Sequence, residues 1–199
     1  MPQRRRGAEL KDAIYSAAVE LLEQEGYEAV TFQNVAKRAK TTRSVLYRYW
    51  EDTFTLIYEA SRQAVMKSPN WHGSVIDQSF NSGSLRTDLF EMLKSLRDNS
   101  QLFPKNFLSF MYFEQAQGKK HMDERILDIE SNNLIIIERI LARAQERGEA
   151  RENIAKNAKL LPFQISRYHI FIDNKLMTDD DISHLVDEIL LPIYKEIVV

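Results

Sequence analysis

Apolar residues recur at three- and four-residue spacing along most of the chain, which is the period of amphipathic helices. This pattern predicts long helices over 8–24, 53–67, 85–99, 103–117, 121–147, 152–174 and 178–197, and two short helices inside 31–50. The stretch 68–84 is rich in Ser, Asn, Gly and Pro, and we expect a loop there. The sequence therefore predicts an all-α fold of about nine helices.

The stretch 31–50 combines two short helical patterns with five basic residues and no acid. Thr31 suits the N-cap of the first helix, and Thr41 or Thr42 suits the N-cap of the second. Two short helices joined by a tight turn make a helix-turn-helix, whose second helix fits the major groove of DNA. The basic residues that favour a nucleic-acid partner are Lys37, Arg38, Lys40, Arg43 and Arg48.

At these positions the sequence resembles the TetR family of transcriptional regulators, and the resemblance covers about residues 10–64. Residues that match the family signature are Thr31, Val35, Ala36, Ala39, Leu46 and Tyr47, and Trp50 stands where the family has an aromatic Phe. Two departures are Lys40, in place of the usual turn Gly, and Thr53, in place of a Lys. Because a left-handed turn residue is easy only for Gly, Lys40 costs about 1 kcal/mol there.

The second short helix is expected to carry the side chains that meet DNA. Arg43 and Arg48 have the chemistry either to read guanine or to hold phosphate, and Val45 suits a thymine methyl group. By family resemblance, the Tyr47 hydroxyl bonds a phosphate. The full set expected at the DNA is Thr31, Thr42, Arg43, Ser44, Val45, Tyr47, Arg48 and Tyr49.

The resemblance implies a three-helix DNA-binding domain over 8–52 and a larger helical domain over 53–199 for ligand binding and dimerisation. No Lys or Arg interrupts the aromatic stretch 107–117, which favours an apolar or aromatic effector with one hydrogen-bonding group. Asn133 lies on an apolar stripe, where its amide needs a partner in the protein or on a ligand. The expected pocket walls are Met92, Phe107, Phe110, Met111, Asn133 and Tyr168.

The last two predicted helices are more apolar than the core of one protomer requires. In the TetR family the corresponding pair forms a four-helix bundle with its symmetry mate, so we expect a homodimer and a near-palindromic DNA operator. The residues expected at the dimer interface are Leu161, Ile165, Leu185 and Ile189.

Composition limits the remaining possibilities. The formal net charge of −2 by itself argues against nucleic acid, but the positive charge is concentrated in 31–50 and in Arg4–Arg6, which forms either a solvated tail or an arm on DNA. The 199 residues contain no Cys, no apolar run near the ~20 residues of a membrane span and no signal-peptide pattern. We therefore expect a cytoplasmic protein without a membrane partner.

The main alternative class is an all-α enzyme, and a second is a small-molecule-binding helical protein whose helix-turn-helix is non-functional. The four histidines lack the spacing of recognised metal motifs, and no nucleotide-binding or nucleophile motif is present. We accordingly expect no metal site, no cofactor and no catalytic residue. The sequence favours a ligand-responsive DNA-binding regulator, a repressor that a small apolar or aromatic molecule releases from its operator.

Overall fold

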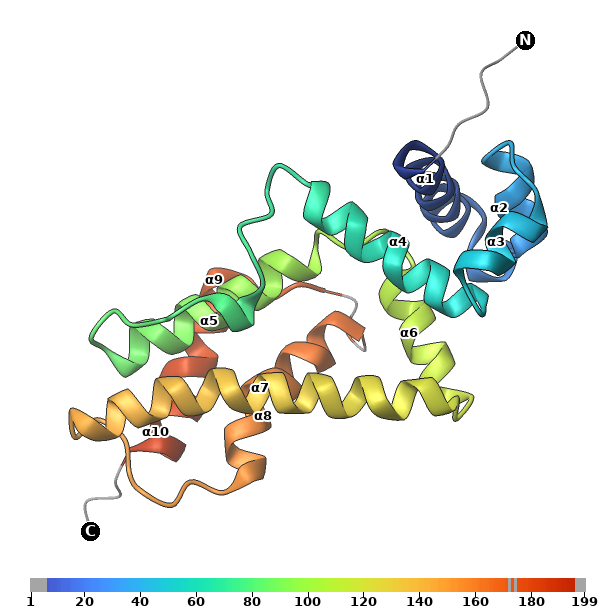
Figure 1. Cartoon of the computed structure of the whole chain (residues 1–199). Coiled ribbons are helices and arrows are strands. Elements are labelled where there is room, and N and C mark those ends of the chain that lie inside the picture. The colour runs from blue at the N-terminus through green and yellow to red at the C-terminus, as the bar shows by residue number, and fades with distance from the viewer. Residues whose placement is uncertain (1–6, 172, 174, 196–199) are drawn as a thin grey trace. The chain divides into compact units, whose positions relative to one another are not determined.

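The computed structural model describes residues 7–171, 173 and 175–195, and all regular structure in these residues is helical (Figure 1). This confirms the all-α fold. The chain divides into two compact units, the first made of Met1–Trp71 and Gln101–Ala116, the second of His72–Ser100 and Gln117–Val199. The predicted arm Arg4–Arg6 and the last residues of the predicted helix 178–197 lie outside the described residues.

The first unit contains five helices and one 3-10 turn. They are α1 (Ala8–Glu25), the turn Tyr27–Ala29, α2 (Phe32–Arg38), α3 (Arg43–Tyr49), α4 (Thr53–Lys67) and α6 (Phe107–Ala116). The predicted N-cap Thr31 is confirmed, and Asp52 caps α4 in the same way. The Thr31 hydroxyl accepts the Asn34 N–H at 3.1 Å, and Asp52 Oδ1 accepts the Thr55 N–H at 2.8 Å. These side chains fix where α2 and α4 begin, because each satisfies a backbone donor that has no partner inside the helix.

Helices α1 and α4 pack along each other and form the centre of the first unit. Their buried faces consist mainly of aliphatic side chains, among them Ile14, Leu21, Leu22, Leu56 and Ile57. Asp12 on α1 strengthens the pair by accepting a hydrogen bond from Gln63 Nε2 at 2.8 Å and by pairing with Lys67 Nζ at 3.1 Å. The helix-turn-helix is thus attached to a scaffold that two long helices make rigid.

Helix α6 begins at Phe107, four residues later than its sequence pattern predicts. Asn106 precedes it with a φ of 69°, a left-handed conformation that cannot belong to a right-handed helix. The Asn106 side chain instead donates to the Leu22 carbonyl oxygen at 2.9 Å, near the end of α1. Pro104 therefore precedes the helix, although the predicted start at 103 would put it in the first turn.

The second unit contains the remaining helices and one 3-10 turn. They are the turn Val75–Asp77, α5 (Leu85–Ser100), α7 (Lys120–Glu146), α8 (Lys156–Phe171), α9 (Asp179–His184), a π-helical segment (Leu185–Leu190) and α10 (Leu191–Tyr194). The last three follow one another without a break and correspond to the predicted helix 178–197. Helix α8 starts later than predicted, because Asn153 has a φ of 55°.

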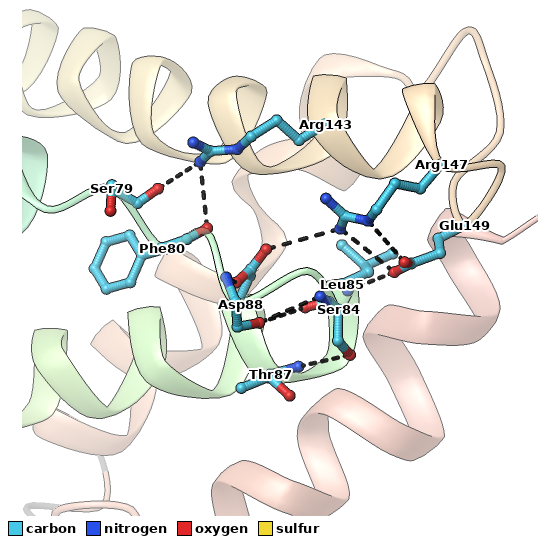
Figure 2. A network of polar contacts seen from close by, with 10 residues as sticks. Ser79, Phe80, Ser84, Leu85, Thr87, Asp88, Arg143, Arg147 and Glu149 are labelled. Atoms are coloured by element: carbon cyan, nitrogen blue, oxygen red, sulfur yellow. Dashed lines mark hydrogen bonds and ion pairs between the residues drawn. The ribbon is translucent and has the colours of Figure 1, made fainter.

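The core of the second unit is aliphatic, with Leu89, Met92, Ile137 and Ile140 fully buried. The loop before α5 and the first turn of α5 are held by Arg143 of α7 and by Arg147, the residue directly after α7 (Figure 2). Arg143 donates to the carbonyl oxygens of Ser79 and Phe80, while Arg147 Nη2 lies 3.8 Å from Asp88 Oδ2.

Glu149 completes this network. Its Oε2 accepts the Leu85 N–H at 2.5 Å, and its Oε1 accepts from Arg147 Nε at 2.7 Å. These bonds, with the Arg147 bond the stronger influence, hold the pKa of Glu149 below its ordinary value. The start of α5 is therefore tied to the end of α7 through a charged residue.

Candidate DNA-binding surface

The turn between α2 and α3 is a Schellman motif built around Lys40. Lys40 has a φ of 55°, which confirms the left-handed conformation expected at this position. Its N–H donates to the Lys37 carbonyl at 3.3 Å, and the Thr41 N–H donates to the Ala36 carbonyl at 2.9 Å. These two bonds satisfy carbonyl groups at the end of α2 and fix the angle at which the chain enters α3.

Helix α3 divides sharply into a buried and an exposed side. Leu46 is fully buried, as is Trp50 at the C-cap position directly after the helix. Arg43, Ser44, Tyr47, Arg48 and Tyr49 are exposed, Val45 is half-buried, and Thr31 and Thr42 are exposed at the N-cap positions of α2 and α3. All eight residues predicted at the DNA therefore lie in the helix-turn-helix, and seven of them are exposed to solvent.

Tyr47 is exposed yet held in place by an aromatic contact. Its side chain is 65% exposed, and its ring meets the Phe32 ring edge-on at a centroid distance of 4.8 Å. Thr31 and Tyr47 border the same open groove, together with Glu28, Glu51 and other residues of this corner. Thr31 and Tyr47, both expected at DNA, thus lie at one corner of the helix-turn-helix, which also carries these two acids.

The basic side chains of the stretch 31–50 differ in exposure and in the partners they contact within the protein. Arg38 pairs with Glu25 at 2.5 Å, which links α2 to α1 and turns this arginine toward the scaffold. The Arg48 guanidinium lies 4.9 Å from the centroid of the Tyr49 ring, and its Nη2 donates to the Tyr49 hydroxyl at 3.2 Å. Arg43 is exposed at the first turn of α3, where a side chain reaches base edges in this motif.

Comparison with known proteins links this helix-turn-helix to transcriptional regulators. The family model described as "Bacterial regulatory proteins, tetR family" matches residues 14–58, which include the whole helix-turn-helix. The DNA-binding transcriptional repressor TetR of Mycobacteroides abscessus is 27% identical over 191 residues, covering 94% of each chain. Residues 14–58 therefore have the pattern of the TetR-family DNA-binding domain, and the chain as a whole is similar to a TetR repressor.

Other similar proteins are also transcriptional regulators or repressors. An HTH-type transcriptional regulator of Bacillus subtilis, YdeS, is 38% identical over 48 residues, which is 24% of each chain. Among solved structures, the TetR family transcription regulator SCO0332 superposes with a TM-score of 0.55 at 20% identity, covering 92% of this chain and 97% of that one. SmeT, a repressor of a Stenotrophomonas maltophilia efflux pump, gives 0.56 at 17% identity over 94% and 90%. These structures show the same fold.

The six residues expected to line an effector pocket fall into both units of the chain. Phe107, Phe110 and Met111 are in the first unit, and Met92, Asn133 and Tyr168 are in the second. The burial of Phe110 is explained by protein contacts, since its ring lies 5.6 Å from the Phe54 centroid and 6.1 Å from the Tyr27 centroid. The pocket stays a prediction.

The residues expected at the dimer interface all lie in the second unit, but they differ in exposure. Leu161 and Ile165 on α8 are half-buried against the unit's own core, and Ile189 is 41% exposed. Leu185 is only 5% exposed, because it packs inside that core. It supports the fold of its own protomer rather than offering surface to a partner, so the remaining three carry the interface prediction.

Two residues that support α3 are not marked by the sequence pattern. Phe32 is buried in α2, and its ring also contacts the Tyr47 ring. Glu59 on α4 accepts a hydrogen bond from Trp50 at the end of α3. A buried indole N–H needs an acceptor inside the protein, and Glu59 is the one acid within the sequence of α4.

No helix among the described residues is long and apolar enough to cross a membrane.

Proposed function

We propose that this DNA-binding regulator is a homodimeric repressor that binds a near-palindromic operator through α3 and leaves it when a small apolar or aromatic molecule binds. The observation that carries the proposal is the polar, solvent-exposed side of α3, opposite the buried Leu46 and Trp50. The Mycobacteroides abscessus relative, which matches along nearly its whole length, is named as a repressor.

Arg43 is the leading residue for sequence recognition. It is exposed in the first turn of α3, and Ser44 is exposed beside it. A bidentate contact between arginine and guanine contributes about 1–3 kcal/mol of discrimination against the wrong base. If Arg43 instead contacts phosphate, its removal would weaken binding equally on every sequence and reduce the salt dependence.

Tyr47 and Arg48 serve the DNA backbone in this proposal. Phe32 holds the Tyr47 ring while leaving its hydroxyl free to donate to a phosphate oxygen. Arg48 rests on the Tyr49 ring and hydroxyl, an exposed arrangement from which a phosphate can draw the guanidinium away. Both contacts position the protein on the duplex without reading its sequence.

A homodimer supplies the second half-site. Helix α8 contributes the half-buried Leu161 and Ile165 to the apolar surface. The π-helical segment Leu185–Leu190 contributes the exposed Ile189. A stable isologous interface buries at least on the order of 1,200 Å² in total. Two recognition helices related by a two-fold axis enter major grooves about 34 Å apart, which requires a near-palindromic operator.

The switch is proposed to act through α4 and α6, which both pack with α1–α3 in the first unit. The Phe110 ring on α6 contacts Phe54 at the start of α4 and Tyr27 just before α2. Asn106 adds its bond to the Leu22 carbonyl of α1. An effector that prefers another position of α6 or α4 would thus strain the support of the helix-turn-helix. A hundredfold loss of operator affinity requires about 2.7 kcal/mol of coupling.

The proposal is tested by selecting bound sequences from a random DNA pool and measuring affinities for the selected operator. Arg43→Ala is expected to weaken operator binding by about 1–3 kcal/mol if it reads a base. Tyr47→Phe keeps the ring against Phe32 but removes the hydroxyl. Operator binding is expected to weaken by about 1 kcal/mol because the hydrogen bond to phosphate is lost. Arg62→Ala, which removes an exposed arginine from α4, is the matched control.

Unchanged operator affinity in both Arg43→Ala and Tyr47→Phe would refute α3 as the reading helix. The switch is tested separately by screening compounds that release the operator and titrating one of them by calorimetry, with and without DNA. Reciprocity requires DNA to weaken effector binding by the same factor as effector weakens DNA binding. Equal effector affinities in the two titrations would leave a DNA-binding protein without the proposed switch.

A further inference from the structure

Trp50 ends the recognition helix and carries a buried polar group. The side chain is 2% exposed, so its indole N–H needs an acceptor inside the protein. Glu59, on α4, provides it: Trp50 Nε1 donates to Glu59 Oε2 at 2.8 Å. A phenylalanine at position 50 would fill similar space but would have no hydrogen to donate, so the indole makes this link possible.

The same carboxylate oxygen also binds α1. The Tyr15 hydroxyl donates to Glu59 Oε2 at 2.7 Å, and the Tyr15 and Trp50 rings meet edge-on at 5.6 Å. Burial, and then the hydrogen bond to Glu59, raise the pKa of Tyr15, so its hydroxyl stays protonated as a donor. Lys11 Nζ lies 5.6 Å and 5.7 Å from the two ring centroids and adds a positive charge to the cluster.

The cluster matters because α3 is too short to hold its own position. A helix of seven residues is unstable in isolation, so its direction depends on the contacts that anchor it. The Schellman turn fixes the start of α3, and Leu46 buries its middle. The bond from Trp50 to Glu59 fixes its end, against two long helices that already pack together.

We infer that Glu59 is a positioning residue for DNA recognition: by accepting from both Trp50 and Tyr15, it sets the direction of α3. The inference rests on the proposed role of α3 in reading DNA. Glu59 itself lies on α4 behind the helix-turn-helix and acts through Trp50. Its loss therefore misdirects the exposed side chains of α3 and leaves their charges unchanged.

The experiment compares Glu59→Gln with Glu20→Gln, which removes an exposed carboxylate from α1 in the same unit. The affinity of each protein is measured for the selected operator and for random-sequence DNA of equal length. Circular dichroism establishes that each variant is folded at the temperature used. Glu59→Gln is expected to weaken operator binding about tenfold, the lower end of what a charge-assisted hydrogen bond contributes.

Random-sequence DNA separates positioning from mere loss of folded protein. Non-specific binding depends on charge near the phosphates, so Glu59→Gln is expected to change it less than about twofold. Partial unfolding would reduce both affinities by the same factor. Equal losses on the two DNAs, or an operator affinity equal to that of Glu20→Gln, would overturn the inference.

Two further measurements make the test specific. Trp50→Phe removes the hydrogen-bond donor. The double variant Trp50→Phe, Glu59→Gln is therefore expected to bind the operator less than about twofold more weakly than Trp50→Phe alone. Additive losses in the double variant would mean that Glu59 does not act through Trp50. The indole N–H signal of Trp50 in a nitrogen-15 NMR spectrum, assigned with Trp71→Phe, is expected to move in Glu59→Gln and not in Glu20→Gln.

The NMR measurement also distinguishes this inference from the proposed function. A wild-type protein that selects no operator would refute the function, and the positioning role with it, even if the indole signal responded to Glu59→Gln. A wild-type protein that binds its operator, combined with an indole signal that ignores Glu59→Gln, would overturn the positioning role alone.

Discussion

Lys40 offers a direct test of the turn geometry, because its left-handed backbone has an energetic cost that glycine avoids. With φ at 55°, any residue with a Cβ pays about 1–2 kcal/mol relative to a right-handed conformation. Glycine escapes this strain but loses about 0.5–1 kcal/mol more conformational entropy on folding than alanine. We therefore expect Lys40→Gly to be more stable than Lys40→Ala by roughly 0.5–1 kcal/mol.

Comparing Gly with Ala at one position removes the lysine charge from both variants. The assay is urea unfolding monitored by circular dichroism. In a thermal melt, the same free-energy difference would appear as a shift of about 1–4 °C in Tm for a chain of this size. Lys37 is the matched control, since it is also an exposed lysine of the same motif but lies inside α2. There Lys37→Gly is expected to be less stable than Lys37→Ala by up to about 1 kcal/mol.

The stability difference between the Gly and Ala variants is expected to have opposite signs at positions 40 and 37. Because both comparisons contain the same entropy difference, subtracting one from the other leaves the left-handed strain, about 1–2 kcal/mol. A Gly variant less stable than the Ala variant at both positions would show that residue 40 does not adopt the left-handed conformation. The Schellman turn would then be wrong, and with it the angle between α2 and α3.

Two further predictions concern the second unit. Ile189→Glu is expected to give monomers in light scattering and to lose operator binding, because it puts charge on exposed apolar surface; a dimer as stable as that of Glu188→Gln would contradict this. Glu149 has a pKa below its ordinary value, so its stabilising bonds are present above about pH 4.5 and are lost as pH falls through the lowered pKa. Glu149→Gln should therefore lose less stability between pH 7 and pH 3 than wild type in urea unfolding, whereas Glu146→Gln should lose as much as wild type.

The sequence predicted the helices well where the signals are local. Helical periodicity located the long helices, and Thr31 caps the start of α2 as expected, while Asp52 and Thr178 cap α4 and α9 in the same way. The left-handed turn at Lys40 was predictable for the same reason, since it depends on hydrogen bonds within a few residues. The beginnings of α6 and α8 were placed too early, because Asn106 and Asn153 adopt left-handed conformations that no periodicity reveals.

The exposed side of α3 was also set by the sequence. Ser44 and Arg48 lie on the opposite side of α3 from the buried Leu46, so its burial turns these two side chains toward solvent. The partners of buried residues were a different matter. An apolar stripe shows that a residue is covered but not by what, and Leu185 proved to face its own core although its pattern equally suited a dimer interface.

By itself, then, the sequence determined the all-α fold and the helix-turn-helix, since each rests on spacings of a few residues. Only the tertiary structure decided that Phe110 packs against Phe54 and that one oxygen of Glu59 joins Tyr15 to Trp50. Tyr15 and Glu59 are separated by 44 positions in the chain. Contacts at such separations depend on how whole helices pack together, which no local pattern of residues encodes.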